Sequence, residues 1–221
     1  MASPEFEALK ARLNYLKSTL PKSTVLNQKQ TDHVKAVVLH QHAACEQFIE
    51  DRSSQVADAA VALYNNSGTM GRTAKHLCVF PLIADIKQPP DVKKVAAVFG
   101  SVKFGIFIDP SYLTSNPLQI KQLLNIGYQA YKRTWDSNNG ITQKYQLKML
   151  AALGVDIGEF DPGFVSSVNT LAKVRGEAAH TNLVVATNVA DPTAVRTWTP
   201  QLISGFEALD AELTDLPNKL Q

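Results

Sequence analysis

A long helix is the feature that most restricts the fold of this chain. Residues 31–64 contain neither glycine nor proline, the two residues that most often interrupt a helix. Apolar residues recur in this stretch at spacings of three and four, which places them on one helical face. They are Val34, Val37, Val38, Cys45, Phe48, Val56, Ala59, Ala60 and Leu63. The pattern predicts one long packed helix that ends near the polar residues 65–68.

Further stretches show the same helical spacing. The segments are residues 4–20, the region 117–153 with a polar loop at 137–140 and a second helix at 142–153, residues 161–180, and residues 200–216. Gly154 is expected to cap the helix that precedes it. The pair Asp161-Pro162 is expected to start the next helix, because aspartate caps helix N-termini and proline fits the first helical position.

Residues 69–116 have a different character. Four prolines interrupt the segment, and residues 95–108 are rich in β-branched and aromatic side chains. We therefore expect an irregular insertion that holds short strands. The sequence as a whole predicts a mainly α fold in a single domain, residues 1–221, with this insertion at about residues 69–116.

Composition excludes several classes of protein. The 22 Lys and Arg residues barely exceed the 20 Asp and Glu residues, so a broad cationic surface for nucleic acid is not expected. The longest apolar stretch, residues 76–84, is too short to span a bilayer, and the first residues do not resemble a signal peptide. We expect a cytoplasmic protein that does not associate with membranes, in which Cys45 and Cys78 are reduced core residues.

Arg175 interrupts the apolar face of the helix at residues 161–180. Phe164, Val168 and Leu171 form that face, and the same spacing continues to Arg175. Burial of an unpaired charge costs several kcal/mol. Arg175 must therefore be paired, line a pocket or lie at an interface. A structural ion pair with an acid such as Glu46 or Glu50 is one interpretation.

His180 follows on the same helix but on another face. At about 100° per residue, five residues separate its side chain from that of Arg175 by about 140°. The two side chains can meet only if the helix ends or distorts near His180, or if a second copy of the helix packs across a two-fold axis. A lone histidine in such a place is also commonly structural.

The sequence Arg175-Gly176-Glu177-Ala178-Ala179-His180 resembles the Arg-x4-His motif of the HEPN superfamily, most closely its stand-alone bacterial ribonucleases. The long helix reading His40-Gln41-His42-Ala43-Ala44-Cys45-Glu46-Gln47-Phe48-Ile49-Glu50-Asp51 also fits that family. The resemblance covers mainly residues 34–63 and 144–182. It implies an antiparallel helical bundle that forms a homodimer and cleaves RNA without a metal or other cofactor.

The resemblance assigns roles to particular residues. Arg175 and His180 are the implied catalytic residues, Glu46 is the implied acid that orients the arginine, and Gly176 and Glu177 are supporting residues within the motif. An imidazole can move the proton of a ribose 2′-hydroxyl near neutral pH, and a guanidinium can hold a phosphate through two hydrogen bonds. The expected function is an endoribonuclease that acts as a bacterial toxin or antiviral defence effector.

Two departures from the family keep a second hypothesis open. Gly176 stands where a polar residue is usual, and Thr181 stands where glycine is frequent. These changes favour a catalytically inactive, HEPN-like dimer that binds RNA, a nucleotide or a protein partner. A scaffold or a neutralising antitoxin partner in a two-gene system is a third hypothesis. His40 and His42 lie on different helix faces, so no metal site is expected from them.

A local RNA surface is a further hypothesis, because basic and aromatic residues alternate in the second half of the chain. The basic residues are Lys121, Lys132, Arg133, Lys144, Lys148 and Lys173, and the aromatic ones are Tyr128, Tyr131 and Trp135. Aromatic rings can stack on bases. The alternative is that the aromatic residues belong to the core and the lysines only solvate a face.

Overall fold

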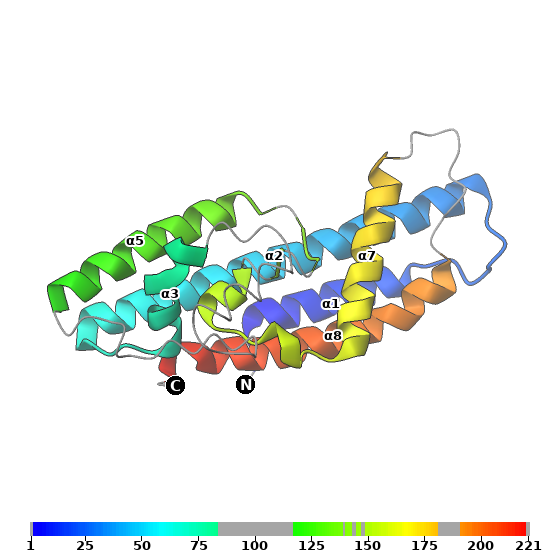
Figure 1. Cartoon of the computed structure of the whole chain (residues 1–221). Helices are drawn as coiled ribbons and strands as arrows, with labels where there is room; N and C mark the ends of the chain where they lie inside the picture. The colour runs from blue at the N-terminus through cyan, green and yellow to red at the C-terminus, as the bar shows by residue number, and fades with distance from the viewer. Residues whose placement is uncertain are drawn as a thin grey trace. The chain divides into compact units, whose positions relative to one another are not determined.

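A computed structural model describes residues 2–83, 117–138, 140–142, 145–146, 149–180 and 191–219 of the chain (Figure 1). Within these ranges the structure contains six α-helices and no strand, which confirms the mainly α fold. The helices are α1 (Pro4–Ser18), α2 (Gln28–Ser67), α3 (Arg72–Ile83), α5 (Pro117–Asp136), α7 (Pro162–His180) and α8 (Pro192–Asp215). Three short 3₁₀ helices are η2 (Ala151–Leu153), η3 (Ile157–Glu159) and η4 (Leu216–Asn218). No helix in the described ranges is both long enough and apolar enough to cross a bilayer.

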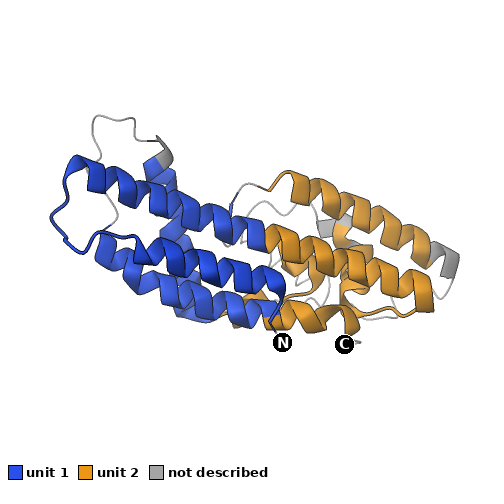
Figure 2. Cartoon of the chain, turned by 180° about the vertical axis from the view of Figure 1, so that it is seen from behind, with its two compact units in different colours: residues 1–48, 140–142, 161–210 blue, residues 49–139, 143–160, 211–221 orange. Residues whose placement is uncertain are grey.

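The chain divides into two compact units that interleave in sequence (Figure 2). Unit 1 comprises residues 1–48, 140–142 and 161–210, and unit 2 comprises residues 49–139, 143–160 and 211–221. Both α2 and α8 therefore contribute residues to each unit. The expectation of a single domain spanning residues 1–221 stays a prediction.

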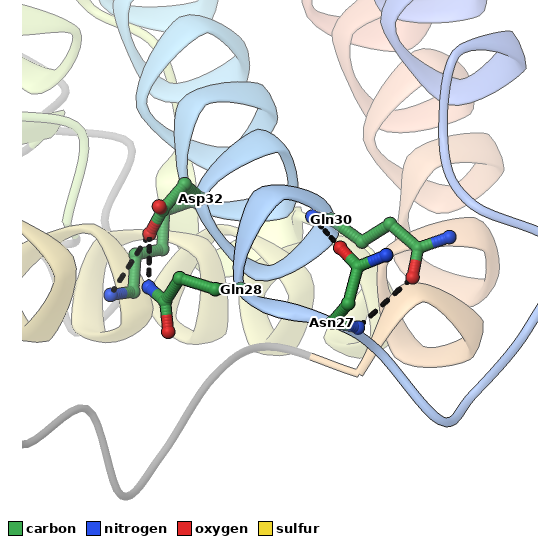
Figure 3. Close-up of polar contacts among 5 residues, drawn as sticks. Asn27, Gln28, Gln30 and Asp32 are labelled. Carbon is green, nitrogen blue, oxygen red and sulfur yellow. Dashed lines mark hydrogen bonds and ion pairs between the residues drawn. The ribbon is translucent and has the colours of Figure 1, made fainter.

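A reciprocal pair of side-chain hydrogen bonds fixes the start of α2 (Figure 3). Asn27 Oδ1 accepts a hydrogen bond from Gln30 N at 3.0 Å, and Gln30 Oε1 accepts one from Asn27 N at 3.0 Å. This capping box satisfies two backbone donors that have no partner inside the helix. At the other end, Gly68 has φ +72° and donates its N–H to Tyr64 O at 2.8 Å. The predicted long helix is confirmed, and these caps extend it at both ends.

Unit 1 is built from α1, α7 and the adjoining parts of α2 and α8. α1 runs opposite in direction to α2 and α8, whereas α7 runs across them (Figure 1). Four buried rings meet edge to face in its core: Phe48 packs against Phe6 at 6.3 Å and Phe206 at 5.3 Å, and Phe206 packs against Phe164 at 5.1 Å. A Cβ atom at Gly205 would lie 2.0 Å from the Phe164 ring. The missing side chain therefore lets α7 cross directly over the backbone of α8.

Hydrogen bonds also join the two ends of unit 1. Ser3 caps α1 by accepting a hydrogen bond from Phe6 N at 3.1 Å. The same serine donates from N and from Oγ to the buried carboxylate of Asp210, at 2.8 and 2.6 Å. A charged group that is 1% exposed is stabilised by such donors. These contacts hold the start of α1 against α8.

The structure of unit 2 contradicts the prediction of an irregular insertion for residues 72–83. Residues 72–83, expected to be irregular because of Pro81, form the helix α3. Pro81 cannot donate to the carbonyl of Leu77 one turn earlier, and α5 approaches that carbonyl at Gly127, where a Cβ atom would lie 1.7 Å from Leu77 O. Tertiary packing therefore stabilises a helix that the proline alone argues against. The strands expected in residues 95–108 lie outside the described residues.

Of the remaining helix boundaries, two agree with the prediction and one does not. Asp161 Oδ1 accepts a hydrogen bond from Phe164 N at 2.9 Å, which confirms the predicted start of α7. Gly154, at φ +97°, caps the 3₁₀ helix before it, as expected. The last helix was predicted from Pro200, but α8 begins at Pro192, and Pro200 lies inside it. The start signal was the pair Asp191-Pro192, in which Asp191 Oδ1 accepts from Thr193 N at 2.9 Å.

Candidate active site

The inward face of α7 is formed as the sequence predicts. Phe164, Val168 and Leu171 are each at most 1% exposed. Arg175 comes one turn after Leu171 on this face and is half-buried. The helix therefore packs its apolar residues in the core of unit 1 and presents a guanidinium at the next position along the same stripe.

His42, on the unit 1 part of α2, shares the environment of Arg175. Its side chain is buried, with the residue only 3% exposed. Burial, and to a smaller extent the positive charge of Arg175, lower the pKa of His42 from 6.5 to about 4. The imidazole is consequently neutral at physiological pH, because both burial and a neighbouring cation disfavour its protonated form.

Glu46 lies one helical turn after His42 on the same face of α2. Its Oε2 atom is 3.7 Å from His42 Nδ1. Glu46 thus lies beside His42, and the charge of Arg175 contributes to the low pKa of the same histidine. The direct pairing of Arg175 with Glu46 that the sequence suggests stays a prediction.

The C-terminal half of the motif is only partly described. His180 is the last residue of α7, and its side chain lies outside the described residues. The convergence of His180 with Arg175 therefore stays a prediction. Glu177 is half-buried within α7.

Gly176 does not serve a close contact within the described part of the chain. A Cβ atom built there would meet no described atom within 4 Å. Gly205 shows the opposite situation, because a Cβ atom there would overlap the Phe164 ring. The described residues therefore leave space beside the backbone of α7 at Gly176.

His42 is a site residue that sequence reasoning missed, because it was considered only with His40 as a metal ligand. His40 is exposed, whereas His42 is buried. The available signal was its position: His42 lies four residues after Val38 and three before Cys45, on the apolar stripe that starts at Val34. It also lies four residues before Glu46. Within the described ranges, no group of three or more His, Cys, Asp or Glu side chains is arranged to hold a metal ion.

The predicted RNA surface is not supported at Tyr131. That residue is 1% exposed in unit 2 and donates its hydroxyl hydrogen bond to Met149 O at 3.0 Å. The core interpretation is therefore confirmed for this ring. Trp135 is half-buried and donates from Nε1 to Glu50 O at 3.1 Å. Stacking of RNA on the remaining aromatic residues stays a prediction.

The cysteines have the environment that the sequence predicts. Both Cys45 and Cys78 are free and buried. Burial raises the pKa of the Cys45 thiol and raises that of Cys78 to about 12. Neither thiol is therefore ionised at neutral pH, and neither has the reactivity of a thiolate nucleophile.

Comparisons with protein-family models, curated protein sequences and solved structures gave no match for this chain. The resemblance to the HEPN superfamily consequently remains a hypothesis based on the motif at residues 175–180 and its helical setting.

Proposed function

We propose that the chain is a metal-independent endoribonuclease of HEPN type, which acts in the cytoplasm as a bacterial toxin or antiviral effector. The observation that carries the proposal is the placement of Arg175. Its guanidinium is half-buried on the packed face of α7 beside a buried neutral histidine, and His180 ends the same helix. A cation in such a position is available to a phosphate while water has limited access to it.

In the proposed reaction, the ribose 2′-oxygen attacks the adjacent phosphorus atom as its proton passes to the imidazole of His180. The bond between phosphorus and the 5′-oxygen of the next nucleotide then breaks, and that oxygen receives a proton. The products are a 2′,3′-cyclic phosphate and a 5′-hydroxyl end. Arg175 stabilises the negative charge that builds on the phosphate oxygens during attack.

The proposed active form is a homodimer. Five residues separate Arg175 from His180, so their side chains diverge on one regular helix. A two-fold axis near the C-terminal end of α7 would bring each arginine close to the partner's histidine. The space that the described residues leave beside Gly176 supports this arrangement, because a glycine lets a second helix backbone approach closely.

The direct test is cleavage of a structured RNA by purified protein in the presence of a chelator. The wild type should cleave it, whereas His180→Ala and Arg175→Lys should each lose at least about a hundredfold in rate. His40→Ala is the matched control, because it removes an exposed histidine and should cleave at the wild-type rate. Retained activity in His180→Ala, cleavage of DNA, or dependence on a divalent ion would rule out this mechanism.

A non-catalytic dimer that binds RNA, a nucleotide or a protein partner is the second candidate. Gly176 favours it, because the helix offers no side chain at that position and no described atom fills the space beside it. In this case the folded wild type should bind a single-stranded RNA or a nucleotide without cleaving it. Binding measured by fluorescence anisotropy alongside product analysis separates the two functions.

A further inference from the structure

We propose that one end of unit 1, the basic end, is a binding surface for single-stranded RNA. It consists of an exposed arginine–tyrosine stack and four further positive charges. Its residues are Arg12, Tyr15, Lys17, Lys22, Lys29 and Arg196, all of which belong to unit 1. Its role in holding a substrate rests on the proposed nuclease function, but RNA binding itself can be tested without cleavage.

Positive charge is concentrated in the first part of the chain, although the chain as a whole is nearly neutral. Between Ala8 and Cys45 lie six of the 22 Lys and Arg residues and only one of the 20 Asp and Glu residues, Asp32. In the rest of the chain, the remaining 16 basic residues are outnumbered by the remaining 19 acidic ones. A local excess of positive charge attracts a polyanion even when the net charge of the protein is only +2.

A contact between α1 and α2 brings two of these lysines to the same end of the unit. His33 Nε2 donates a hydrogen bond to Thr19 O at 3.0 Å, so the first turns of α2 lie against the end of α1. Lys17 precedes Thr19 by two residues, and Lys29 precedes His33 by about one helical turn. Both ammonium groups therefore lie near the junction of the two helices.

The start of α8 adds a further positive charge at this junction. Arg196 Nη2 donates to Leu20 O at 3.0 Å and to Pro21 O at 2.7 Å. Lys22 follows Pro21 directly and is exposed. The guanidinium of α8 and the lysine of the connecting loop are thus held close to the end of α1.

The lysines of the basic end are not neutralised within the described part of the chain. Asp32 is the one acid among residues 8–45; it accepts a hydrogen bond from Gln28 at 3.0 Å (Figure 3) and pairs with Lys35 at 3.8 Å. Lys17, Lys22 and Lys29 form no ion pair with a described carboxylate. Such lysines are available to the phosphates of a nucleic acid.

The Arg12–Tyr15 stack provides a surface for a base. The Arg12 guanidinium lies 5.7 Å from the centroid of the Tyr15 ring, and Tyr15 is 59% exposed. Unpaired bases stack on aromatic rings and on guanidinium planes. Lys17 follows Tyr15 by two residues and lies on the other flank of the exposed face of α1, so a strand that contacts both crosses that face.

A single RNA strand fits this surface better than an anionic membrane does. Val25, which is 85% exposed, is the only large apolar side chain exposed in residues 19–27. A surface that inserts into a membrane needs a broader apolar face beside its lysines. Separate lysines for phosphates and a stacked ring for a base are the features that bind single strands.

Fluorescence anisotropy with a labelled 2′-O-methyl oligoribonucleotide measures binding alone, because the attacking 2′-hydroxyl is blocked. Lys22→Gln/Lys29→Gln should weaken binding about tenfold and should reduce the salt dependence by about 1.4 in log–log slope, since each lost phosphate contact contributes about 0.7. The matched control, Lys121→Gln/Arg133→Gln, removes two exposed positive charges from unit 2 and should bind like the wild type. Equal losses in the two double variants, or no binding by the wild type, would overturn the proposal.

Substitutions at Tyr15 test the stack with the same probe. Tyr15→Ala should weaken binding about fivefold or more, whereas Tyr15→Phe keeps the ring and should bind like the wild type. An exposed side chain contributes little to stability, so both variants should fold. Wild-type affinity in Tyr15→Ala would remove the stack from the proposal. Binding to phosphatidylserine vesicles but not to RNA would instead assign the basic end to a membrane.

Cleavage assays separate this inference from the proposed function. If the variants behave as expected on the uncleavable RNA but the wild type cleaves no RNA, the binding surface is supported and the nuclease function fails. If the wild type cleaves RNA but the two double variants bind equally well, the nuclease function is supported and the basic end is wrong.

Discussion

Acidification should destabilise the protein through His42. The imidazole has a pKa of about 4 in the folded chain and 6.5 when unfolded, so the unfolded state binds its proton more tightly. The contribution of neutral His42 to the free energy of unfolding is therefore fully present above about pH 6.5 and decreases as the pH falls toward 4. Because the residue is only 3% exposed, solvent does little to relieve the penalty for charging it.

The size of the effect follows from the two pKa values. One pKa unit corresponds to about 1.4 kcal/mol, so full protonation removes about 3 kcal/mol from the free energy of unfolding. Between about pH 7.5 and about pH 5, the same linkage removes about 2 kcal/mol. Most carboxylates remain ionised over this interval, and the effect of His42 is consequently well separated from general acid denaturation.

Urea denaturation of the wild type and of His42→Gln at the two pH values provides the measurement. The wild type should lose about 2 kcal/mol more than the variant on acidification. Glu212 in unit 2 has a raised pKa, caused mainly by burial, and thus acts in the opposite direction, but it is present in both proteins and cancels. Equal losses in the two proteins would refute the conclusion that His42 is neutral because it is buried beside Arg175.

Other substitutions test the packing of α7. Gly205→Ala should destabilise the protein by about 1–3 kcal/mol, because its Cβ atom would overlap the Phe164 ring. Gly176→Ala should instead stabilise it by up to about 1 kcal/mol, because no described atom lies within 4 Å of the added Cβ. Thermal melts of the two variants check both signs, and equal shifts would contradict the crossing of α7 over α8. Asp161→Ala should cost about 1 kcal/mol through loss of the N-cap to Phe164 N, while Asp161→Asn, which can still accept that bond, should melt close to the wild type.

Helix positions were predictable where local rules and packing agree. The long helix, the cap at Gly154 and the start at Asp161-Pro162 depend on side chains close in sequence, and all three are present. The helix boundaries predicted from prolines were wrong where tertiary packing outweighs the local preference of proline. Pro81 lies within α3, and Pro200 lies within α8.

Local sequence patterns predict the site residue on α7, whereas Glu46 on α2 was expected only as a possible partner of Arg175 and from the family resemblance. The periodicity of α7 places Arg175 on the packed face, and the structure agrees. The neighbour of Arg175 comes from α2, more than a hundred residues earlier, and no local pattern gives that proximity. A histidine within an apolar stripe was nevertheless a visible signal, since a buried polar side chain requires a partner.

The interleaving of the two units has a consequence for how the chain folds during synthesis. Unit 1 needs both α1 and the part of α8 that ends at Asp210, and the hydrogen bonds between Ser3 and Asp210 span 207 residues. Such long loops close slowly, and an N-terminal segment cannot complete its core while the ribosome still holds the rest. The emerging α1 and α2 must therefore keep their apolar stripes exposed until α8 has been translated, and chaperones that bind exposed apolar helices should engage this chain over most of its synthesis.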